Sequence, residues 1–280
     1  MNTTNNKAIL VTGASGGIGS VLVPMLLAHG WRVYAGVTSH NPLPAHAQLV
    51  TLRLDVTDAA SIAVARDTIT EMQSSRGLQA VINLAGIMSQ GPVEIIPESE
   101  LRRAYDINVF GSVAIIQQFL PLIRVGKGRI INVTAVTALA SGPFFGPVAS
   151  SKAALAYLTD SLRMELAPWD IPVVNIMPGA MKTPVFRKAS EAFERSLGTV
   201  PKDKIRLYQP LIAGATKALQ KQKESDPKVA AKVILKAAES THPKPRYFAG
   251  SDAVVAGHLI PFLPRPVKDK MLIAMVGGKK

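Results

Sequence analysis

The chain has 280 residues, 48% of them hydrophobic, and contains no cysteine. This length and apolar content are enough for one large core, so we expect a single domain over residues 1–280. The lack of cysteine excludes disulfides and thiolate metal ligands, and we expect no metal site. Lysine and arginine (32) outnumber aspartate and glutamate (19), giving a net charge of +13. This charge suits an anionic cofactor, an anionic membrane surface or nucleic acid, or is simply a solvated basic surface.

Residues 1–7 are polar and lack the apolar core of a signal peptide, and no apolar run reaches the ~20 residues needed to span a bilayer. We therefore expect a cytoplasmic protein that is soluble or, as an alternative, makes peripheral contact with a membrane. Nucleic-acid binding is disfavoured, because only 5% of the residues are aromatic and the basic residues are scattered.

A glycine-rich turn stands between the apolar run 8–11 and a helical pattern over residues 18–26. Its sequence is Thr12-Gly13-Ala14-Ser15-Gly16-Gly17-Ile18-Gly19. Without Cβ atoms the backbone is able to turn tightly and approach a pyrophosphate, while the following helix directs free N–H groups and its positive dipole end at it. The pattern predicts a dinucleotide site, with a plain tight turn as the alternative.

Further along, short and almost continuously apolar segments are typical of strands buried on both faces. They are residues 32–37, 49–54, 79–84, 129–133 and 172–176. Helical patterns over 58–75, 98–122 and 147–167 separate them. This alternation predicts an α/β fold with a doubly wound parallel sheet. Pro24 falls inside the first helix, where it removes a backbone donor.

Motifs in this order resemble the short-chain dehydrogenases/reductases over roughly residues 7–185. They are the glycine turn, Leu54-Asp55-Val56, Asn83-Leu84-Ala85-Gly86, Asn108, Lys152 and Pro178-Gly179-Ala180-Met181-Lys182-Thr183. The resemblance implies a Rossmann-type sheet of about seven strands. It also implies that Asp55 meets the adenine amino group, that residues 83–86 line the adenosine side and that Thr183 holds the nicotinamide carboxamide. The alternatives are a helix cap for Asp55 and a turn for Pro178-Gly179.

The glycine turn and the resemblance together assign a set of residues to cofactor binding. The set is Gly13, Ser15, Gly16, Gly17, Ile18, Gly19, Thr38, Asp55, Val56, Asn83, Ala85, Gly86, Asn108, Lys152, Pro178, Gly179 and Thr183. The turn after the second strand, residues 36–40, lacks the acidic residue that accepts the ribose hydroxyls of NAD. Hydroxyls at Ser15, Thr38 and Ser39, together with His40, are able to donate to an extra phosphate. We therefore expect NADP(H) rather than NAD(H), although no arginine is present at this turn.

The chain departs from the family pattern before Lys152. Family members carry a tyrosine four residues before the lysine and a serine thirteen residues before that tyrosine. Here these positions hold Val148 and Ala135. The tyrosine hydroxyl protonates the alkoxide that forms when a carbonyl accepts hydride, and losing a general acid costs a factor of ~100 to 10,000. Efficient alcohol dehydrogenation is therefore not expected.

Other hydroxyls nearby are poor replacements. Ser151 points about 100° away from Lys152 on a helix, and Thr134 faces the opposite side of a strand from Ala135. Thr137 is the best candidate, because it shares the face of Ala135 if the strand continues. The predicted catalytic residues are accordingly Lys152, Asn108 and Thr137, where the resemblance implies that Lys152 holds the nicotinamide ribose and Asn108 supports a helix bend and a water relay.

Residues 186–280 are expected to shape the substrate site. Helical patterns cover 186–197, 203–223 and 227–238, and 245–250 is typical of a last strand. This strand and the apolar, basic tail after it resemble the retinoid and steroid branch of the family. Such a tail is able to cover a lipophilic pocket, rest on a membrane or pack on the core.

Two functions follow. One is an NAD(P)-dependent oxidoreductase of altered mechanism that acts on a lipophilic small molecule, for example by reducing an iminium ion. The other is a cofactor-binding protein with a non-redox catalytic, sensing or scaffold role. By analogy with relatives, the helices over 98–122 and 147–167 are expected to form a homodimer or tetramer.

Overall fold

The structure is a computed structural model that describes residues 7–38 and 43–275. Its centre is a parallel seven-stranded sheet in the order β3-β2-β1-β4-β5-β6-β7. The strands are β1 (Ala8–Thr12), β2 (Arg32–Val37), β3 (Leu49–Arg53), β4 (Ala80–Asn83), β5 (Arg129–Val133), β6 (Val173–Pro178) and β7 (Arg246–Ala249). The predicted α/β class and doubly wound parallel sheet are confirmed.

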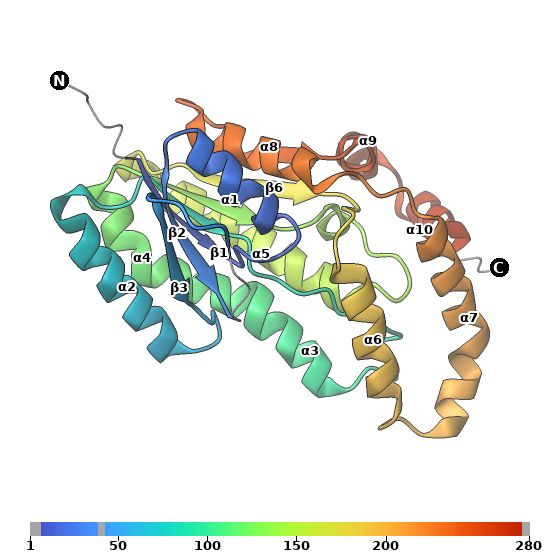
Figure 1. The fold of residues 1–280 in the computed structure, drawn as a ribbon. Helices are drawn as coiled ribbons and strands as arrows, with labels where there is room; N and C mark the ends of the chain where they lie inside the picture. The colour runs from blue at the N-terminus through green and yellow to red at the C-terminus, as the bar shows by residue number, and fades with distance from the viewer. Residues whose placement is uncertain (1–6, 39–42, 276–280) are drawn as a thin grey trace.

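Helices cover both faces of the sheet (Figure 1). They are α1 (Gly19–Ala28), α2 (Ala59–Gln73), α3 (Glu98–Tyr105), α4 (Ser112–Val125), α5 (Gly146–Glu165), α6 (Val185–Leu197), α7 (Lys202–Lys221), α8 (Pro227–Glu239), α9 (Ser251–Leu259) and α10 (Arg265–Met275). Short 3₁₀ turns are η1 (Ser74–Arg76), η3 (Val136–Ala138), η4 (Ala167–Trp169) and η5 (Ile260–Phe262), and η2 (Asp106–Gly111) is π-helical.

The side chains of β1 show how the strands divide the core. Ile9 and Val11 pack with α1 and α8 in one cluster, and Ala8 and Leu10 pack with α2 and α4 in another. Successive strand residues point to opposite faces, so a strand buried on both sides has no polar face. This explains the continuous apolar runs of the sequence.

The helix expected over 98–122 is one continuous path with an unexpected centre. The π-helical η2 separates α3 from α4, and the path extends to Val125. Glu98–Val125 is long and apolar enough to cross a membrane by length and composition, but half of its apolar window is buried inside the fold. The core helix of a globular domain meets the same criterion, so the finding is weak evidence for a membrane span.

The helices expected over 186–197, 203–223 and 227–238 are present as α6, α7 and α8. α6 and α7 extend away from the sheet as an antiparallel pair, joined at residues 198–201 (Figure 1). The tail after β7 forms α9, η5 and α10, where the sequence indicated only an apolar and basic segment. The division of the chain at residue 185 stays a prediction.

Candidate functional site

A cleft of about 2120 Å³ lies at the carboxyl ends of the strands. It is lined by the glycine turn, the ends of β2, β5 and β6, and parts of α5, α6, α7 and α9. Strands β1 to β3 are added toward one edge of the sheet and β4 to β7 toward the other, so the order of addition reverses between β1 and β4. Ligands of open α/β sheets bind at such a switch point, outside the carboxyl ends of the strands.

The glycine turn leaves room that other residues would fill. Gly13 has φ +64°, and a Cβ on it would stand 2.8 Å from the Cα of Ala85. A Cβ on Gly17 would overlap the side chain of Thr183. Within the described residues, the N–H groups of Ser15, Gly17 and Ile18 make no hydrogen bond. Free N–H groups at the start of α1 and a backbone without side chains fit the pyrophosphate of a dinucleotide.

On the adenosine side, a carboxylate is held at the end of β3. Asp55 Oδ1 accepts hydrogen bonds from the hydroxyl (2.7 Å) and the N–H (2.9 Å) of Thr57. The side-chain bond from Thr57 is the main cause that lowers the pKa of Asp55 below its usual value. The alternative role as the cap of α2 belongs instead to Asp58, whose Oδ1 accepts from the N–H of Ala60 at 2.9 Å. Asp55 and its neighbour Val56 line the cleft.

Thr12 holds the next segment in place. Its buried hydroxyl accepts from the N–H groups of Leu84 (3.1 Å) and Ala85 (3.0 Å), which bring the chain after β4 to the glycine turn. Ala85 and Gly86 line the cleft. The sequence showed Thr12 as part of a motif but gave no sign of this role.

Asn83, one of the predicted cofactor residues, has its side chain away from the cleft, and its role in cofactor binding stays a prediction. It does not line the cleft, but is buried within the sheet, where its Nδ2 donates to Asn132 Oδ1 at 2.8 Å. Asn132 in turn donates to the hydroxyl of Thr159 at 2.9 Å, which ties β5 to α5. The side chain of a strand residue points to one face of the sheet and not along the strand, so this amide faces α5 and the cleft is lined by the residues after it.

Lys152 reaches the cleft from α5. The residue is 8% exposed, and its ammonium donates to the carbonyl of Val133 at 2.9 Å. Burial lowers the pKa of Lys152 from 10.5 to about 8. A Cβ on Gly86 would stand 3.0 Å from Nζ, so the remaining N–H donors face a gap that only glycine leaves open. Buried donors next to this gap fit the hydroxyls of a ribose.

Asn108 lies in the π-helical turn, and both polar atoms of its side-chain amide form hydrogen bonds within the protein. Oδ1 accepts from the N–H of Ile87 at 2.9 Å, and Nδ2 donates to the carbonyl of Ile87 and to the hydroxyl of Ser151, both at 3.0 Å. The residue is fully buried and does not line the cleft. Asn108 therefore positions the segment 86–88 against α5. Ser151 is buried by the same contact, consistent with its expected orientation away from the site.

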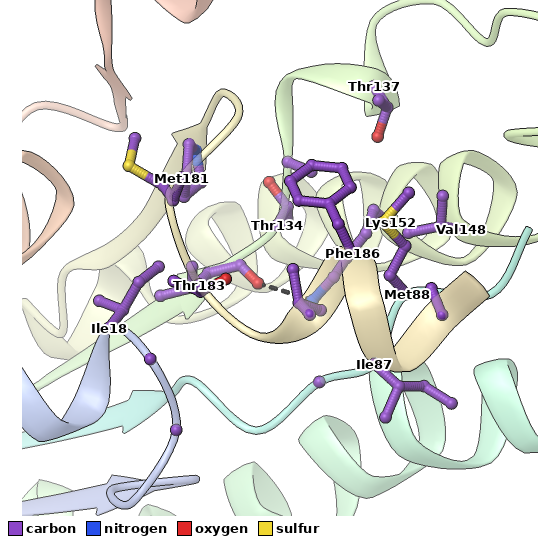
Figure 2. Close-up of a pocket in the computed structure, with 18 of the residues that line it drawn as sticks. Ile18, Ile87, Met88, Thr134, Thr137, Val148, Lys152, Met181, Thr183 and Phe186 are labelled. Atoms are coloured by element: carbon purple, nitrogen blue, oxygen red, sulfur yellow. Dashed lines mark hydrogen bonds between the residues drawn. The ribbon is translucent and has the colours of Figure 1, made fainter. Parts of the chain in front are cut away.

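The walls around Lys152 are apolar where a proton donor would be expected. Ala135 and Val148 both line the cleft, and Val148 is 7% exposed. Figure 2 shows Val148 and Lys152 on α5, with Phe186 projecting from the start of α6 into the same cavity. No hydroxyl is supplied by either position.

The premise for choosing Thr137 is wrong, because β5 ends at Val133 and residues 136–138 form the 3₁₀ turn η3. Thr137 nevertheless lines the cleft, and its buried hydroxyl has no hydrogen-bond partner among the described residues. The hydroxyl of Thr134 is committed elsewhere, since it donates to Asn175 Oδ1 at 2.6 Å. Its predicted orientation away from Ala135 agrees with this contact.

The segment after β6 closes the site. Pro178, Gly179 and Thr183 line the cleft. Gly179 is required there, since a Cβ would overlap the carboxylate of Asp252 from the first turn of α9. Asp252 Oδ2 accepts from the N–H of Ala180 at 2.8 Å and fixes this backbone. Sequence reasoning missed Asp252, because nothing in its local pattern points to a partner 72 residues away.

Around the predicted phosphate turn, Ser15 and Thr38 line the cleft. Ser39 and His40, which the sequence also indicated, lie outside the described residues. Gly16, Gly17, Ile18 and Gly19 line the same part of the cleft.

Comparisons with known proteins agree with this geometry. A 3-amino-tetrahydro-pyrrolizinone reductase of Xenorhabdus hominickii is 33% identical over 254 residues, which cover 88% of each chain. Estradiol 17-beta-dehydrogenase 2 of Rattus norvegicus is 36% identical over 188 residues, 64% of this chain and 49% of that protein, so the match spans about half of its length.

A crystal structure of a short chain dehydrogenase from Burkholderia cenocepacia J2315 in complex with NADP has the same fold. Its TM-score is 0.74 at 24% identity, and the match covers 97% of both chains. The family model for short chain dehydrogenases matches residues 7–194, which contain the glycine turn, Lys152 and the segment after β6. The chain therefore belongs to the short chain dehydrogenase family.

Proposed function

We propose that the protein is an NADP(H)-dependent reductase for a lipophilic small molecule whose reacting group accepts hydride without a proton from the protein. A cyclic iminium ion is such a group, because hydride addition turns it directly into a neutral amine. The single observation that carries this proposal is Val148, an apolar side chain one helical turn before Lys152 in a site with an intact cofactor frame.

The bound nicotinamide would supply the hydride, and the residues of this chain would do the rest. The glycine turn and Thr183 would bind and orient the dinucleotide, and Lys152 would hold the nicotinamide ribose. Ala135, Val148 and Phe186 would exclude water from the reacting carbon. The name of the relative from Xenorhabdus hominickii, a reductase for an amino-tetrahydro-pyrrolizinone, supports a nitrogen-containing ring as substrate.

The oxidation of NADPH by the protein with a panel of cyclic iminium ions and hydrophobic ketones tests this proposal. We expect turnover of iminium ions and little or none of ketones. Equal rates on ketones would contradict it, because they require a proton donor that the site is not expected to contain. Lys152→Met serves as the matched control, since it removes the ribose contact and keeps the apolar wall.

A second candidate function is a non-redox catalytic, sensing or scaffold role that retains the dinucleotide. The absence of a hydroxyl at both Ala135 and Val148 also favours this second function. The same panel separates the two candidates: tight NADPH binding without turnover of any substrate supports the second.

The preference for NADP(H) rests on the neutral end of β2 at Thr38, and on the hydroxyl of Ser15 across the same part of the cleft. A carboxylate at the end of β2 would repel an extra phosphate, and none is present there. Calorimetric titration is expected to give tighter binding of NADPH than of NADH. Equal binding would reject the preference, and binding of neither would reject the cofactor assignment.

We also propose peripheral contact of this cytoplasmic protein with anionic membranes through α9, η5 and α10. These elements expose apolar side chains, of which Phe262 is 85% exposed, beside the basic residues Arg265, Lys268 and Lys270. Such a mixture suits an anionic lipid surface. Co-sedimentation with phosphatidylserine vesicles and with phosphatidylcholine vesicles tests it, and Phe262→Glu is expected to weaken the first.

A further inference from the structure

The positive charge of the protein is concentrated in its last third. Residues 186–280 contain 19 lysines and arginines against 8 acidic residues, whereas residues 1–185 contain 13 against 11. This part of the chain supplies α6, α7 and α9, which line the outer half of the cleft. A cleft edged by one sign of charge raises the local concentration of ligands of the other sign.

Some of these charges lie on the cleft itself. Lys188 in α6, Lys221 at the end of α7 and Lys223 just after it all line the cleft, and we name these three residues the basic rim. α6 and α7 are antiparallel and joined at 198–201, so the start of α6 and the end of α7 lie at the same end of the pair (Figure 1).

The basic rim is not neutralised by the protein. Within the described ranges, none of its three lysines forms an ion pair. Two of the carboxylates that line the cleft lie on the same part of the chain as the basic rim, and both have partners: Glu191 pairs with Arg187, and Asp252 accepts from the N–H of Ala180. Lys204, at the other end of α7, by contrast pairs with Glu94 at 3.8 Å.

Behind the basic rim the cleft is apolar. Most other cleft-lining residues of α6 and α7 are small or apolar, among them Ala189, Ala192, Ala218 and Leu219, while Glu191 is charged and paired with Arg187. Arg195 lines the cleft two turns along α6, about 10 Å from Lys188 at the rise of a helix. The shape and polarity therefore suit an elongated molecule with an apolar body and an anionic group.

We propose that the basic rim binds the carboxylate or phosphate of the substrate, whose apolar body lies between α6 and α7. That the bound anion is a substrate for reduction rests on the proposed function. That the basic rim binds an anion does not, because binding requires no reaction. The cofactor's phosphates share this chemistry. The free N–H groups of the glycine turn already serve a pyrophosphate, which leaves the basic rim for a second anion.

Calorimetric titration in the presence of NADPH tests the proposal with decyl phosphate, decanoate and uncharged decan-1-ol as probes. The variant is Lys188→Gln, Lys221→Gln and Lys223→Gln combined. The matched control is Lys202→Gln, Lys217→Gln and Lys228→Gln, which removes the same charge from exposed positions outside the cleft. We expect the rim variant to bind both anions about tenfold more weakly, a loss of about 1.4 kcal/mol, because ion contacts at exposed lysines are individually weak.

The control variant is expected to bind the anions as wild type does, and decan-1-ol and NADPH are expected to bind equally to all three proteins. If both variants bind the anions equally more weakly, the effect comes from the net positive charge of the protein and not from the basic rim, and the proposal is overturned. Weaker NADPH binding with unchanged anion binding would assign the basic rim to the cofactor and also overturn it. Because these titrations need no turnover, their result is independent of whether iminium ions are reduced.

Discussion

Val148 and Lys152 lie one turn apart on α5, and both face the cleft. The two side chains divide the functions of the site: the lysine is suited to bind a ribose, and the valine removes the hydroxyl that would have protonated an alkoxide. This arrangement is the basis of the proposed reduction, in which the site binds a nicotinamide and supplies no proton to the reacting group.

Val148→Tyr combined with Ala135→Ser is expected to create or raise ketone reduction. A tyrosine at position 148 would bring its hydroxyl near the ammonium of Lys152, and a serine at 135 would orient the substrate oxygen from the turn after β5. NADPH oxidation with hydrophobic ketones measures the gain, which we expect at about 100-fold or more for the double variant. The single variants should gain less.

If wild type reduces ketones as fast as the double variant, another donor must be present. The unpartnered hydroxyl of Thr137 is the first to examine. Thr137→Val would then abolish the activity, and the account of a site without an acid would be wrong.

The buried ammonium of Lys152 also makes stability depend on pH. Its pKa is about 8 in the folded protein and 10.5 when unperturbed, so between these values the unfolded chain binds more protons. The free energy of unfolding of wild type should therefore rise with pH between about 8 and 10.5, relative to Lys152→Met, by up to roughly 3 kcal/mol. Urea unfolding of both proteins at pH 7 and pH 10 measures it. A constant difference would show that the lysine is not desolvated.

At the scale of elements, the π-helical η2 joins the cofactor segment to α5. The side-chain amide of its Asn108 forms hydrogen bonds with the N–H and the carbonyl of Ile87 and with the hydroxyl of Ser151. This one amide therefore links η2, the segment around Ile87 and α5. A π-bulge costs helix regularity and is frequent at functional sites. Here the widened turn carries Asn108, whose amide reaches across to residues 86–88.

Asn108→Ala should destabilise the protein by about 1–3 kcal/mol for each backbone group of Ile87 left without a partner. The N-cap variant Asp58→Ala is a useful comparison, since a lost cap costs about 1 kcal/mol and Asp58 itself does not line the cleft. Urea unfolding compares the two. An effect of Asn108→Ala no larger than that of Asp58→Ala would show that water replaces the amide.

Elements were predictable from the sequence where burial imposes a simple pattern. β2 and β5 have the predicted bounds, because strands covered on both faces are almost continuously apolar. The resemblance implied a helix bend at Asn108, but its π-helical form was not predictable from the local residues, since they fit a regular helix equally well. Thr137 was misplaced because the end of β5 depends on where pairing with β6 stops, and Asp252 was missed because its contact is formed only by the folded chain.

At the scale of the molecule, α5 and η4 expose large apolar side chains. Tyr157 is 79% exposed, Met164 63% and Trp169 57%. Exposed apolar side chains gathered on neighbouring elements are typical of interfaces. They support the expected homodimer, although a tetramer would use further faces.

Light scattering at micromolar concentration should give at least twice the chain mass of 29.8 kDa. Tyr157→Glu is expected to shift this mass toward the monomer, because a charge in an apolar interface is left without a partner. Phe262→Glu, on the exposed tail, is the control and should leave the mass unchanged. A monomeric mass for the wild type would contradict the proposed dimer.

The arm formed by α6 and α7 begins and ends in neighbouring strands. β6 leads into it at Pro178, and after α7 the chain passes through α8 to β7, which pairs with β6 in parallel register. A protease that cuts the exposed turn at 198–201 therefore produces two fragments that remain docked through one continuous sheet. The cut ends of α6 and α7 become free to move, while the start of α6 and the end of α7 stay attached to the domain. A nicked protein would therefore keep its dinucleotide site and lose only the binding of a substrate between the two helices.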